Sequence, residues 1–327
     1  MSELYPLTFL PIYKDKIWGG QKIKTELGKD TGSLPNCGET WEISGVDGNI
    51  SKVADGPLQG HDLKSLIGRY GAQLLGEKIH ARFGDDFPLL IKFIDANQDL
   101  SIQVHPDDTL AKSRHNSFGK TEMWYVMQAD EGATLISGFN QPLDRTKYLD
   151  YFNTGRLTEL LNREQVSAHD VFFLPAGRVH TIGKGLLIAE IQQTSDITYR
   201  IYDFDRKDEQ GNSRELHTEE ALDAIDYNQY DQYKTPYSDQ LNERVPLVNC
   251  TYFTTNKLWF DRTFVADRAD LDSFKIYICL QGTVRISTGN GEVPIKKGEV
   301  ALVPASIKHF TLETSGPAIV LESYIEG

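Results

Sequence analysis

The residues best suited to chemistry in this 327-residue chain lie in and around residues 100–108. The β-branched Ile102 and Val104 alternate there with two polar residues, which is the pattern of a β-strand with two different faces. The polar residues, Gln103 and His105, would therefore project side by side. Because a sheet face is normally buried, this pair needs a partner, and a metal ion would satisfy both side chains. A Gln-x-His pair alone is a weak signal of a metal site.

Two later segments add metal-binding side chains. Residues 120–127 are predicted to form a strand with Glu122 and Trp124 on one face, so a carboxylate lies on a face that the tryptophan indicates is buried. Another strand, predicted to end at Leu174, is followed by a Pro-Ala-Gly turn that presents His180. Two imidazoles, one carboxylate and one amide form a donor set that suits zinc and is compatible with iron, manganese or cobalt.

Charged side chains are also predicted inside apolar strands. Lys92 and Glu190 each interrupt a run of aliphatic residues. Since a buried charge must reach water or pair with an opposite charge, each could serve a site or a structural ion pair. The alternating stretch 195–206 carries Arg200, which either faces a site or faces outward and pairs with a nearby aspartate.

Composition places limits on the class of protein. Hydrophobic residues make up 39% and charged residues 25%, as in globular proteins, and the net charge of −13 makes nucleic acid or an anionic membrane an unexpected partner. The three cysteines are far apart, which argues against a disulfide framework. We see no signal peptide and no apolar run long enough to cross a membrane, and expect a cytoplasmic protein.

The positioning elements are predominantly extended. One helix is predicted over residues 61–83, two short helical patterns lie within 143–166, and residues 207–245 form a polar surface linker that contains a possible helix at 218–225. Residues 1–60 form short strands that could pair with either half of the chain. Their Trp-Gly-Gly at 18–20 marks a turn or a place where the backbone comes close to something.

An internal repeat relates the two halves of the chain. Residues 170–176 match residues 299–305, and in both copies a histidine, His180 or His309, follows the proline by five positions. A repeat of strand-turn units implies a duplicated β domain.

The second copy has lost the polar set. It has no Gln-x-His, and Lys275 stands where the first copy has Glu122. A site that exchanges an acid for a cation should not hold a metal, so we expect His309 to be a packing or surface residue. We predict a metal-binding domain at 1–240 and a degenerate copy without a metal site at 241–327.

In this order, the motifs resemble those of type I mannose-6-phosphate isomerases of the short bacterial form, a family of the cupin superfamily. The resemblance rests on Lys92, on the Ser-Ile-Gln-Val-His-Pro-Asp at 101–107, the Lys-Thr-Glu at 120–122, the Pro-Ala-Gly-Arg-Val-His at 175–180, and the Asp-Ile-Thr-Tyr-Arg at 196–200. General cupins have His-x-His where this chain has Gln-x-His. The Trp-Gly-Gly at 18–20 and Gly-Glu at 38–39 also fit the family.

The resemblance implies a mainly β fold of two cupin, jelly-roll-like barrels with helical segments attached to the first. It implies a metal-dependent aldose–ketose isomerase that interconverts mannose 6-phosphate and fructose 6-phosphate through a cis-enediol, with one Zn²⁺ per chain. The chain is expected to be a monomer or homodimer. The expected metal ligands are Gln103, His105, Glu122 and His180; the catalytic candidates are Arg200, Glu190, Lys120, Lys92 and Asp196; the candidates for phosphate binding are Ser101 and Arg206.

Burial should raise the pKa of Glu190 and so suit it to act as a base near neutrality. Two other classes of function stay open on the residues alone. One is a metal-dependent cupin oxygenase, which would use iron and need no cations for a phosphate. The other is a non-catalytic module that binds a sugar phosphate.

Overall fold

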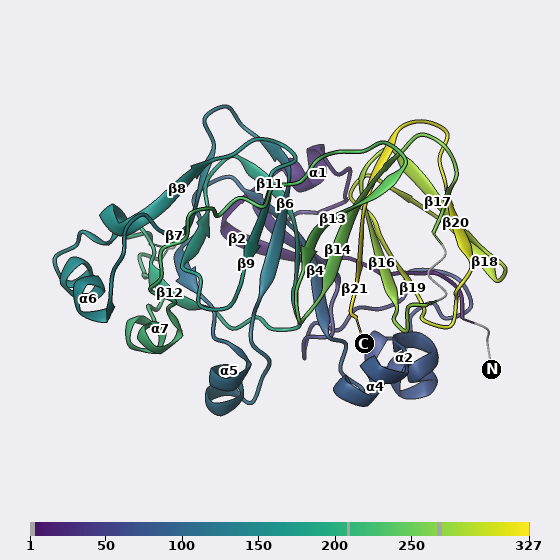
Figure 1. The fold of residues 1–327 in the computed structure, drawn as a ribbon, viewed down its shortest axis with the longest axis horizontal. Helices are drawn as coiled ribbons and strands as arrows, with labels where there is room; N and C mark the ends of the chain where they lie inside the picture. Colours follow the sequence, from purple (N-terminus) through teal and green to yellow (C-terminus); the bar gives the residue numbers. More distant parts are fainter. Residues whose placement is uncertain (1–3, 208–209, 267–269, 327) are drawn as a thin grey trace.

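The computed structural model describes residues 4–207, 210–266 and 270–326. It consists of two β-sandwiches that lie side by side, with short helices at the periphery (Figure 1). Each sandwich contains two sheets whose named strands pair only in antiparallel fashion over the described residues. The mainly β, duplicated fold that the sequence predicts is thus confirmed.

The first sandwich carries the polar motifs. One sheet has the order β2 (Ile12–Gly20), β3 (Cys37–Ile43), β4 (Leu89–Ala96), β11 (Leu186–Gln193), β6 (Glu122–Ala129) and β9 (Val171–Leu174). The opposite sheet has the order β12 (Tyr199–Tyr202), β5 (Ile102–Val104), β10 (His180–Ile182), β7 (Thr134–Phe139) and β8 (Leu161–Gln165).

The central strands of the first sheet are buried on both faces, which explains their nearly continuous apolar sequences. On β4, Ile91 and Phe93 belong to the hydrophobic core shared with the second sandwich, whereas Lys92 lines a cavity inside the first. On β11, Glu190 points into the same cavity. The two-residue period of a strand therefore separates a dry face, which joins the sandwiches, from a polar face, which builds the site.

The second sandwich is formed by the C-terminal part of the chain, with help from the N-terminus. One of its sheets has the order β1 (Leu7–Thr8), β19 (Val300–Val303), β16 (Lys275–Gln281), β21 (Ala318–Tyr324), β14 (Thr254–Phe260) and β13 (Glu243–Asn249). The other has the order β15 (Phe264–Val265), β20 (Phe310–Glu313), β17 (Thr283–Thr288) and β18 (Gly291–Lys296). Residues 1–60 thus contribute strands to both sandwiches. We propose a domain boundary after residue 240, although β1, from the N-terminal part of the chain, pairs with β19 of the second sandwich.

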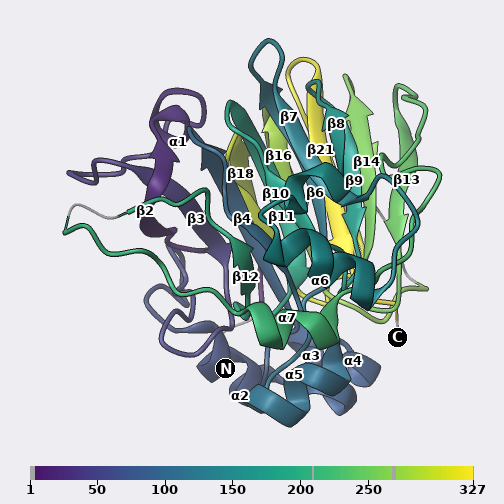
Figure 2. The ribbon, with the colours of Figure 1, turned by 90° about the vertical axis from the view of Figure 1, so that its left-hand side faces the viewer.

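Most of the helices lie together at one end of the sheets, in the lower part of Figure 2. The single helix predicted over 61–83 is wrong, because the segment forms α2 (Leu63–Tyr70), α3 (Ala72–Leu75) and α4 (Glu77–Phe83). Gly71 and Gly76, with φ of 47° and 102°, interrupt it in conformations that helices do not contain. The Asp62 side chain caps the first of these helices by accepting from the Ser65 N–H.

The two helical patterns predicted within 143–166 are found as α6 (Arg145–Asn153) and a 3₁₀ turn, η1 (Leu157–Leu160). The remaining short helices are α1 (Lys22–Thr25), α5 (Asp108–His115) and α7 (Thr218–Ala224), the last inside the predicted linker. Across the described ranges, every helix is too short or too polar to cross a bilayer.

The Trp-Gly-Gly segment ends β2 and makes the close backbone approach that the sequence suggested. A Cβ on Gly19 would lie 2.5 Å from the Asn36 carbonyl oxygen. A Cβ on Gly38 would lie 2.8 Å from the ring of Trp18. These two glycines let β2 and β3 approach closely enough to hold the Trp18 ring against the cavity of the first sandwich.

Candidate metal centre and active-site cavity

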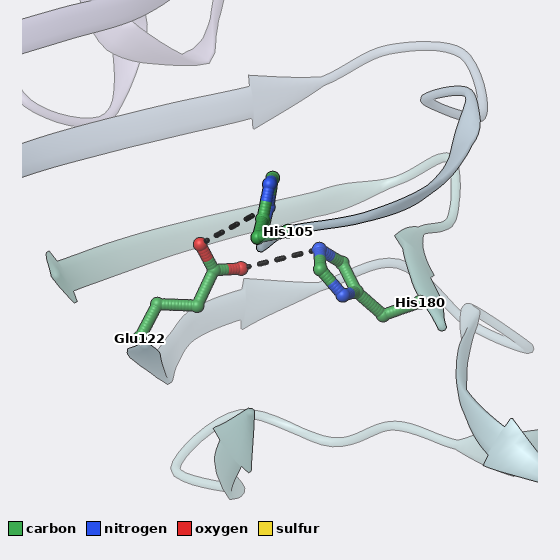
Figure 3. Close-up of side chains that lie close together, drawn as sticks. All are labelled: His105, Glu122 and His180. Carbon is green, nitrogen blue, oxygen red and sulfur yellow. Dashed lines mark ion pairs between the residues drawn. The ribbon is translucent and has the colours of Figure 1, made fainter. Parts of the chain in front are cut away.

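Three of the predicted metal ligands converge inside the first sandwich (Figure 3). Glu122 begins β6, His180 begins β10, and His105 directly follows β5. The Nε2 atom of His105 lies 3.6 Å from Glu122 Oε2, and Nε2 of His180 lies 3.3 Å from Glu122 Oε1. All three residues are 1% exposed, and one donor atom of each lies within 4.8 Å of the others. This buried group could hold a metal ion.

Backbone carbonyl groups orient both imidazoles. His105 Nδ1 lies 2.9 Å from the Ile197 carbonyl oxygen, and His180 Nδ1 lies 2.8 Å from that of Arg178. Because a carbonyl oxygen only accepts, both Nδ1 atoms carry the proton and each Nε2 presents a lone pair to Glu122 when the ring is neutral. Burial, reinforced by the Lys120 charge, lowers the pKa of His180 to about 3 and that of His105 well below its ordinary value. Both rings are therefore neutral donors.

The arrangement is that of a cation-binding group. Two nitrogen lone pairs that face a carboxylate repel it unless a positive charge lies between them. Glu122 Oε1 is buried and, within the described ranges, accepts no hydrogen bond. The 3.3 and 3.6 Å separations, one to each carboxylate oxygen, are close to the roughly 3.4 Å expected between two ligand atoms that share a zinc ion with bonds of about 2.1 Å. The residues present thus fit a divalent metal.

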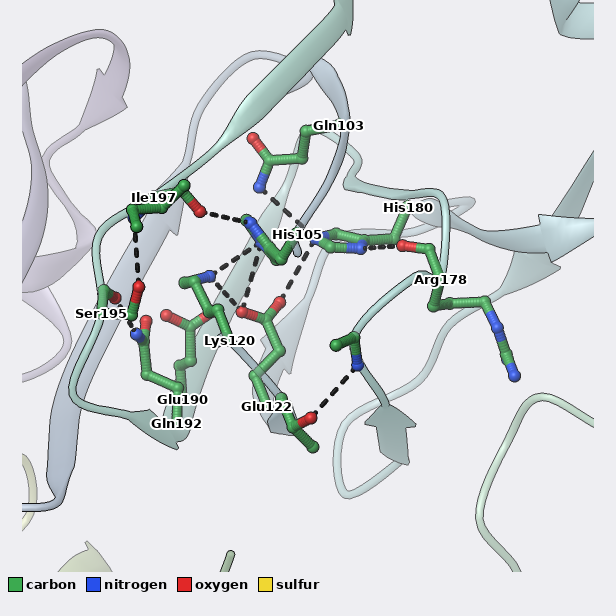
Figure 4. Close-up of polar contacts among 12 residues, drawn as sticks. Gln103, His105, Lys120, Glu122, Arg178, His180, Glu190, Gln192, Ser195 and Ile197 are labelled. Atoms are coloured by element: carbon green, nitrogen blue, oxygen red, sulfur yellow. Dashed lines mark hydrogen bonds and ion pairs between the residues drawn. The ribbon is translucent and has the colours of Figure 1, made fainter. Parts of the chain in front are cut away.

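Lys120 and Gln103 flank this group (Figure 4). The Lys120 ammonium lies 2.8 Å from His105 Nε2 and forms an ion pair with Glu122. The Gln103 amide lies 3.4 Å from His180 Nε2, so it is adjacent to the group, as the sequence predicts. Half a turn about the last torsion of Gln103 exchanges its amide oxygen and nitrogen, which would present the oxygen as a fourth ligand.

Burial, with the added charge of Glu190, raises the pKa of Glu122 to about 7 despite the opposing effect of Lys120. A carboxylate that is this costly to ionise gains most from a metal ion, because the ion replaces the hydration that burial removes.

A cavity of about 330 Å³ opens beside the metal ligands. Most of the residues that the sequence singled out line it: Lys92, Ser101, Gln103, Lys120, Glu190, Asp196 and Arg200. Trp18, Glu39 and Trp41, from the N-terminal strands, form another part of its wall. The sequence signals for Trp18 and Glu39 are the Trp-Gly-Gly and Gly-Glu motifs. The residue pattern alone favours a solvated strand edge over a site role for Glu39, whereas the structure places Glu39 in the cavity wall.

Glu190 is tied to two cavity residues. Its Oε1 accepts from Lys92 Nζ at 3.1 Å, and its Oε2 accepts from Trp124 Nε1 at 2.8 Å. The expectation that burial raises the pKa of Glu190 is wrong in direction: burial does act upward, but the charges of Lys92 and Lys120 outweigh it and lower the pKa. Glu190 is therefore ionised at neutral pH, and Lys92 has the anionic partner that its buried position requires.

The arginines do not all lie where the sequence suggested. Arg200 lines the cavity and donates from Nη1 to the Glu215 carbonyl oxygen at 2.7 Å. Arg206, the predicted phosphate ligand, is absent from the lining described for this cavity, because its guanidinium group is held by Asp203 and by the Asp99 carbonyl oxygen. Arg214, inside the predicted linker, lines the cavity instead. No periodic pattern in that polar segment signals its position.

The two β-sandwiches are of cupin type, and the first places a candidate metal group beside a cation-rich cavity. This combination is typical of cupin enzymes. Family models agree: "Phosphomannose isomerase type I, catalytic domain" matches residues 7–133, and "Mannose-6-phosphate isomerase, cupin domain" matches residues 244–323. The chain belongs to the type I mannose-6-phosphate isomerase family.

Individual proteins support this assignment over nearly the whole chain. Mannose-6-phosphate isomerase ManA of Bacillus subtilis is 35% identical over 320 residues, which cover 96% of this chain and 98% of that protein. Mannose-6-phosphate isomerase of Streptococcus mutans is 36% identical over 300 residues, with 91% and 92% covered. The crystal structure of the B. subtilis mannose 6-phosphate isomerase superposes with a TM-score of 0.87 at 32% identity and covers 98% of this chain and 99% of that one.

Proposed function

We propose that this chain interconverts mannose 6-phosphate and fructose 6-phosphate in the cavity of the first sandwich, with one Zn²⁺ held by His105, Glu122, His180 and Gln103. The observation that carries the proposal is the convergence of two neutral imidazoles and a carboxylate beside a cavity lined by Lys92, Lys120 and Arg200. We further propose a cytoplasmic location, which fits a phosphorylated metabolite.

The reaction moves a proton between C1 and C2 of the open-chain sugar through a cis-enediol. Since the C–H bond is a weak acid, negative charge on the two sugar oxygens must be stabilised as it develops. A bound metal supplies part of this stabilisation as a Lewis acid. The ammonium of Lys120 and the guanidinium of Arg200 supply fixed positive charge at the same cavity wall.

Glu190 is the proposed proton carrier. Its ionised carboxylate faces the cavity, and its contacts with Lys92 and Trp124 fix its orientation. Asp196 is exposed at the cavity, where it is placed to orient Arg200 or to assist opening of the sugar ring. Ser101 is buried beside Gln103 and offers a hydroxyl group to the substrate.

A coupled assay tests the proposal. Mannose 6-phosphate is supplied, fructose 6-phosphate is detected, and the measurement is repeated after treatment with a chelator and after zinc is restored. The expected result is turnover that chelation abolishes and zinc restores. Binding of mannose 6-phosphate without conversion would instead support a non-catalytic module. Product formation that stops when oxygen is removed would support an oxygenase.

A further inference from the structure

Arg200, Arg206 and Arg214 lie close enough for their charges to interact, and one buried carboxylate binds two of them. Asp203 is 5% exposed. Its Oδ1 accepts from Nη2 of Arg206 at 2.6 Å and from Nη2 of Arg214, and its Oδ2 accepts from Nε of Arg214 at 2.8 Å. One negative charge thus holds two positive charges, which leaves the pair cationic.

The two arginines differ in their remaining donors. Arg206 uses its other terminal nitrogen, Nη1, on the Asp99 carbonyl oxygen. Arg214 presents its Asp203-bound edge to the protein, and its Nη1 donates to no acceptor in the part of the chain that the structure describes. The Arg214 side chain is 28% exposed and lines the cavity, so Nη1 is available to a ligand there.

The segment that carries Arg214 also positions Arg200. Arg200 donates from Nη1 to the carbonyl oxygen of Glu215, and the His217 N–H donates to the carbonyl oxygen of Arg200 at 2.7 Å. The chain around residue 215 therefore runs beside β12 and brings two guanidinium groups to one wall of the cavity. Asp203 fixes the second of these groups.

We propose that Arg214 is a phosphate-recognising residue of this enzyme, with Asp203 as its positioning residue. The inference rests on the proposed function, since the ligand is the phosphate dianion of the sugar substrate. Five cations and three carboxylates line the cavity, and two of those carboxylates, Glu39 and Glu190, are paired with Lys16 and Lys92. Lys120 is paired with Glu122, and Arg214 shares the single charge of Asp203 with Arg206, so the excess positive charge lies at Arg200 and at the Arg206–Arg214 pair. A planar guanidinium fork there matches phosphate oxygens.

Arg214→Gln tests the proposal, with Arg163→Gln as the matched control. Arg163 undergoes the same change of charge and size, but it lies outside this cavity and donates to Thr134. For Arg214→Gln we expect KM for mannose 6-phosphate to rise about tenfold or more while kcat stays within about twofold, because the phosphate is bound alike in ground and transition states. The metal content should not change.

Inhibition by inorganic phosphate provides a second readout that a purely structural role would not move. Arg214→Gln should weaken this inhibition, Arg214→Lys should restore part of it, and Arg163→Gln should leave it unchanged. Asp203→Asn should raise KM in the same way, because it releases the Arg214 fork. Equal KM values in Arg214→Gln and Arg163→Gln would overturn the proposal, as would a larger rise in Arg206→Gln than in Arg214→Gln.

Calorimetry separates failure of this proposal from failure of the proposed function. The wild-type chain should bind fructose 6-phosphate more tightly than fructose, and Arg214→Gln should remove most of that difference whether or not turnover is detected. Wild-type binding without conversion would refute only the isomerase function. An unchanged preference for fructose 6-phosphate in Arg214→Gln would refute only the role of Arg214.

Discussion

Each β-sandwich has three neighbouring strands in corresponding positions, β4, β11 and β6 in the first and β14, β21 and β16 in the second. The side chains that these strands direct into the two interiors differ. In the first, β11 pairs Glu190 with Lys92 of β4 and Trp124 of β6. In the second, β21 pairs Glu322 with Asn256 of β14 and Tyr277 of β16. Both glutamates are buried and accept a hydrogen bond from the aromatic partner, at 2.8 Å from Trp124 and 2.7 Å from Tyr277. The duplication therefore extends to an interior acid.

The sandwiches diverge at the positions of the candidate metal ligands. Trp124 packs edge-on against His180 with 5.3 Å between ring centroids, and Tyr277 packs edge-on against Phe310 at 5.8 Å. Phe310, rather than His309, thus takes the place of His180. Lys275 is buried with its ammonium over the Phe310 ring, at the position that corresponds to Glu122. A carboxylate and an imidazole have given way to an ammonium and a phenyl ring.

The comparison shows that a buried glutamate is common to both sandwiches, whereas the candidate metal group of His105, Glu122 and His180 lies in the first. Glu322 accepts from Arg244, Asn256 and Tyr277 and lies in a sandwich without a group of three metal-binding side chains among its described residues. Glu190 has kept a similar set of contacts but faces a cavity. The following variants test this division.

His180→Phe replaces the histidine of the first sandwich by the residue type that the second sandwich has at the corresponding position, Phe310. This variant should have the largest effect. Metal content should fall from about one ion per chain to less than about a tenth, and turnover should fall on the order of a thousandfold, because a ligand is lost. Elemental analysis of the purified protein and the coupled assay measure these effects, and His105→Ala and Glu122→Gln should behave alike. Retention of a full equivalent of metal in His180→Phe would contradict the assigned site.

Arg200→Ala should separate chemistry from metal binding. Turnover should fall by roughly a hundred- to a thousandfold, because a preorganised positive charge is lost from the cavity. Metal content should stay at the wild-type level, since Arg200 pairs with Gln103 through the sheet backbone and its side chain, in the described structure, donates to the Glu215 carbonyl oxygen and to none of the proposed ligands. Steady-state kinetics alongside elemental analysis check both statements, with Arg163→Gln as the control. Wild-type turnover in Arg200→Ala would exclude its catalytic role.

The paired variants Glu190→Gln and Glu322→Gln compare the two interior acids directly. Each removes the charge of a buried acid that is paired with a cation, Lys92 or Arg244, and should lower the free energy of unfolding by about 3 kcal/mol. Only Glu190→Gln should also lower kcat, by about a hundredfold, as expected for loss of a base. Denaturant unfolding and kinetics give the two values. A similar loss of kcat in Glu322→Gln would show that the second sandwich takes part in catalysis.

His309→Ala should have the smallest effect. His309 is exposed, and the buried position next to it belongs to Phe310. We expect metal content and kcat to be unchanged and the free energy of unfolding to change by less than about 0.5 kcal/mol. Thermal unfolding and elemental analysis suffice here. Loss of metal from His309→Ala would place a ligand in the wrong sandwich and refute the comparison.

Strand alternation predicts which side chains of the candidate metal group share a face of their strand. Glu122 and Trp124 share a face because strands repeat every two residues, and in the folded protein both side chains lie against His180. The prediction that His309 is a packing or surface residue was also correct. The repeat aligns His309 with His180 in sequence, whereas in the structure Phe310, one residue later, occupies the corresponding position. A sequence match alone cannot show this shift of one residue.

Features that depend on contacts distant in sequence could not be predicted. Gly71 and Gly76 break a helical pattern whose apolar spacing continues through both of them. The direction of the Glu190 pKa depends on Lys92 and Lys120, which come from other strands. Arg214 is held beside the cavity by Asp203, and no periodic pattern in its polar segment signals this contact.

The most direct test of the metal centre is a titration of the chelated, metal-free protein with Zn²⁺ while the formation of fructose 6-phosphate is followed. We predict that turnover is absent at the start, rises linearly, and reaches its plateau at one ion per chain, and that His180→Phe shows no such rise. Full turnover by the metal-free wild-type protein, or an equal rise in His180→Phe, would contradict a single metal held by His105, Glu122 and His180.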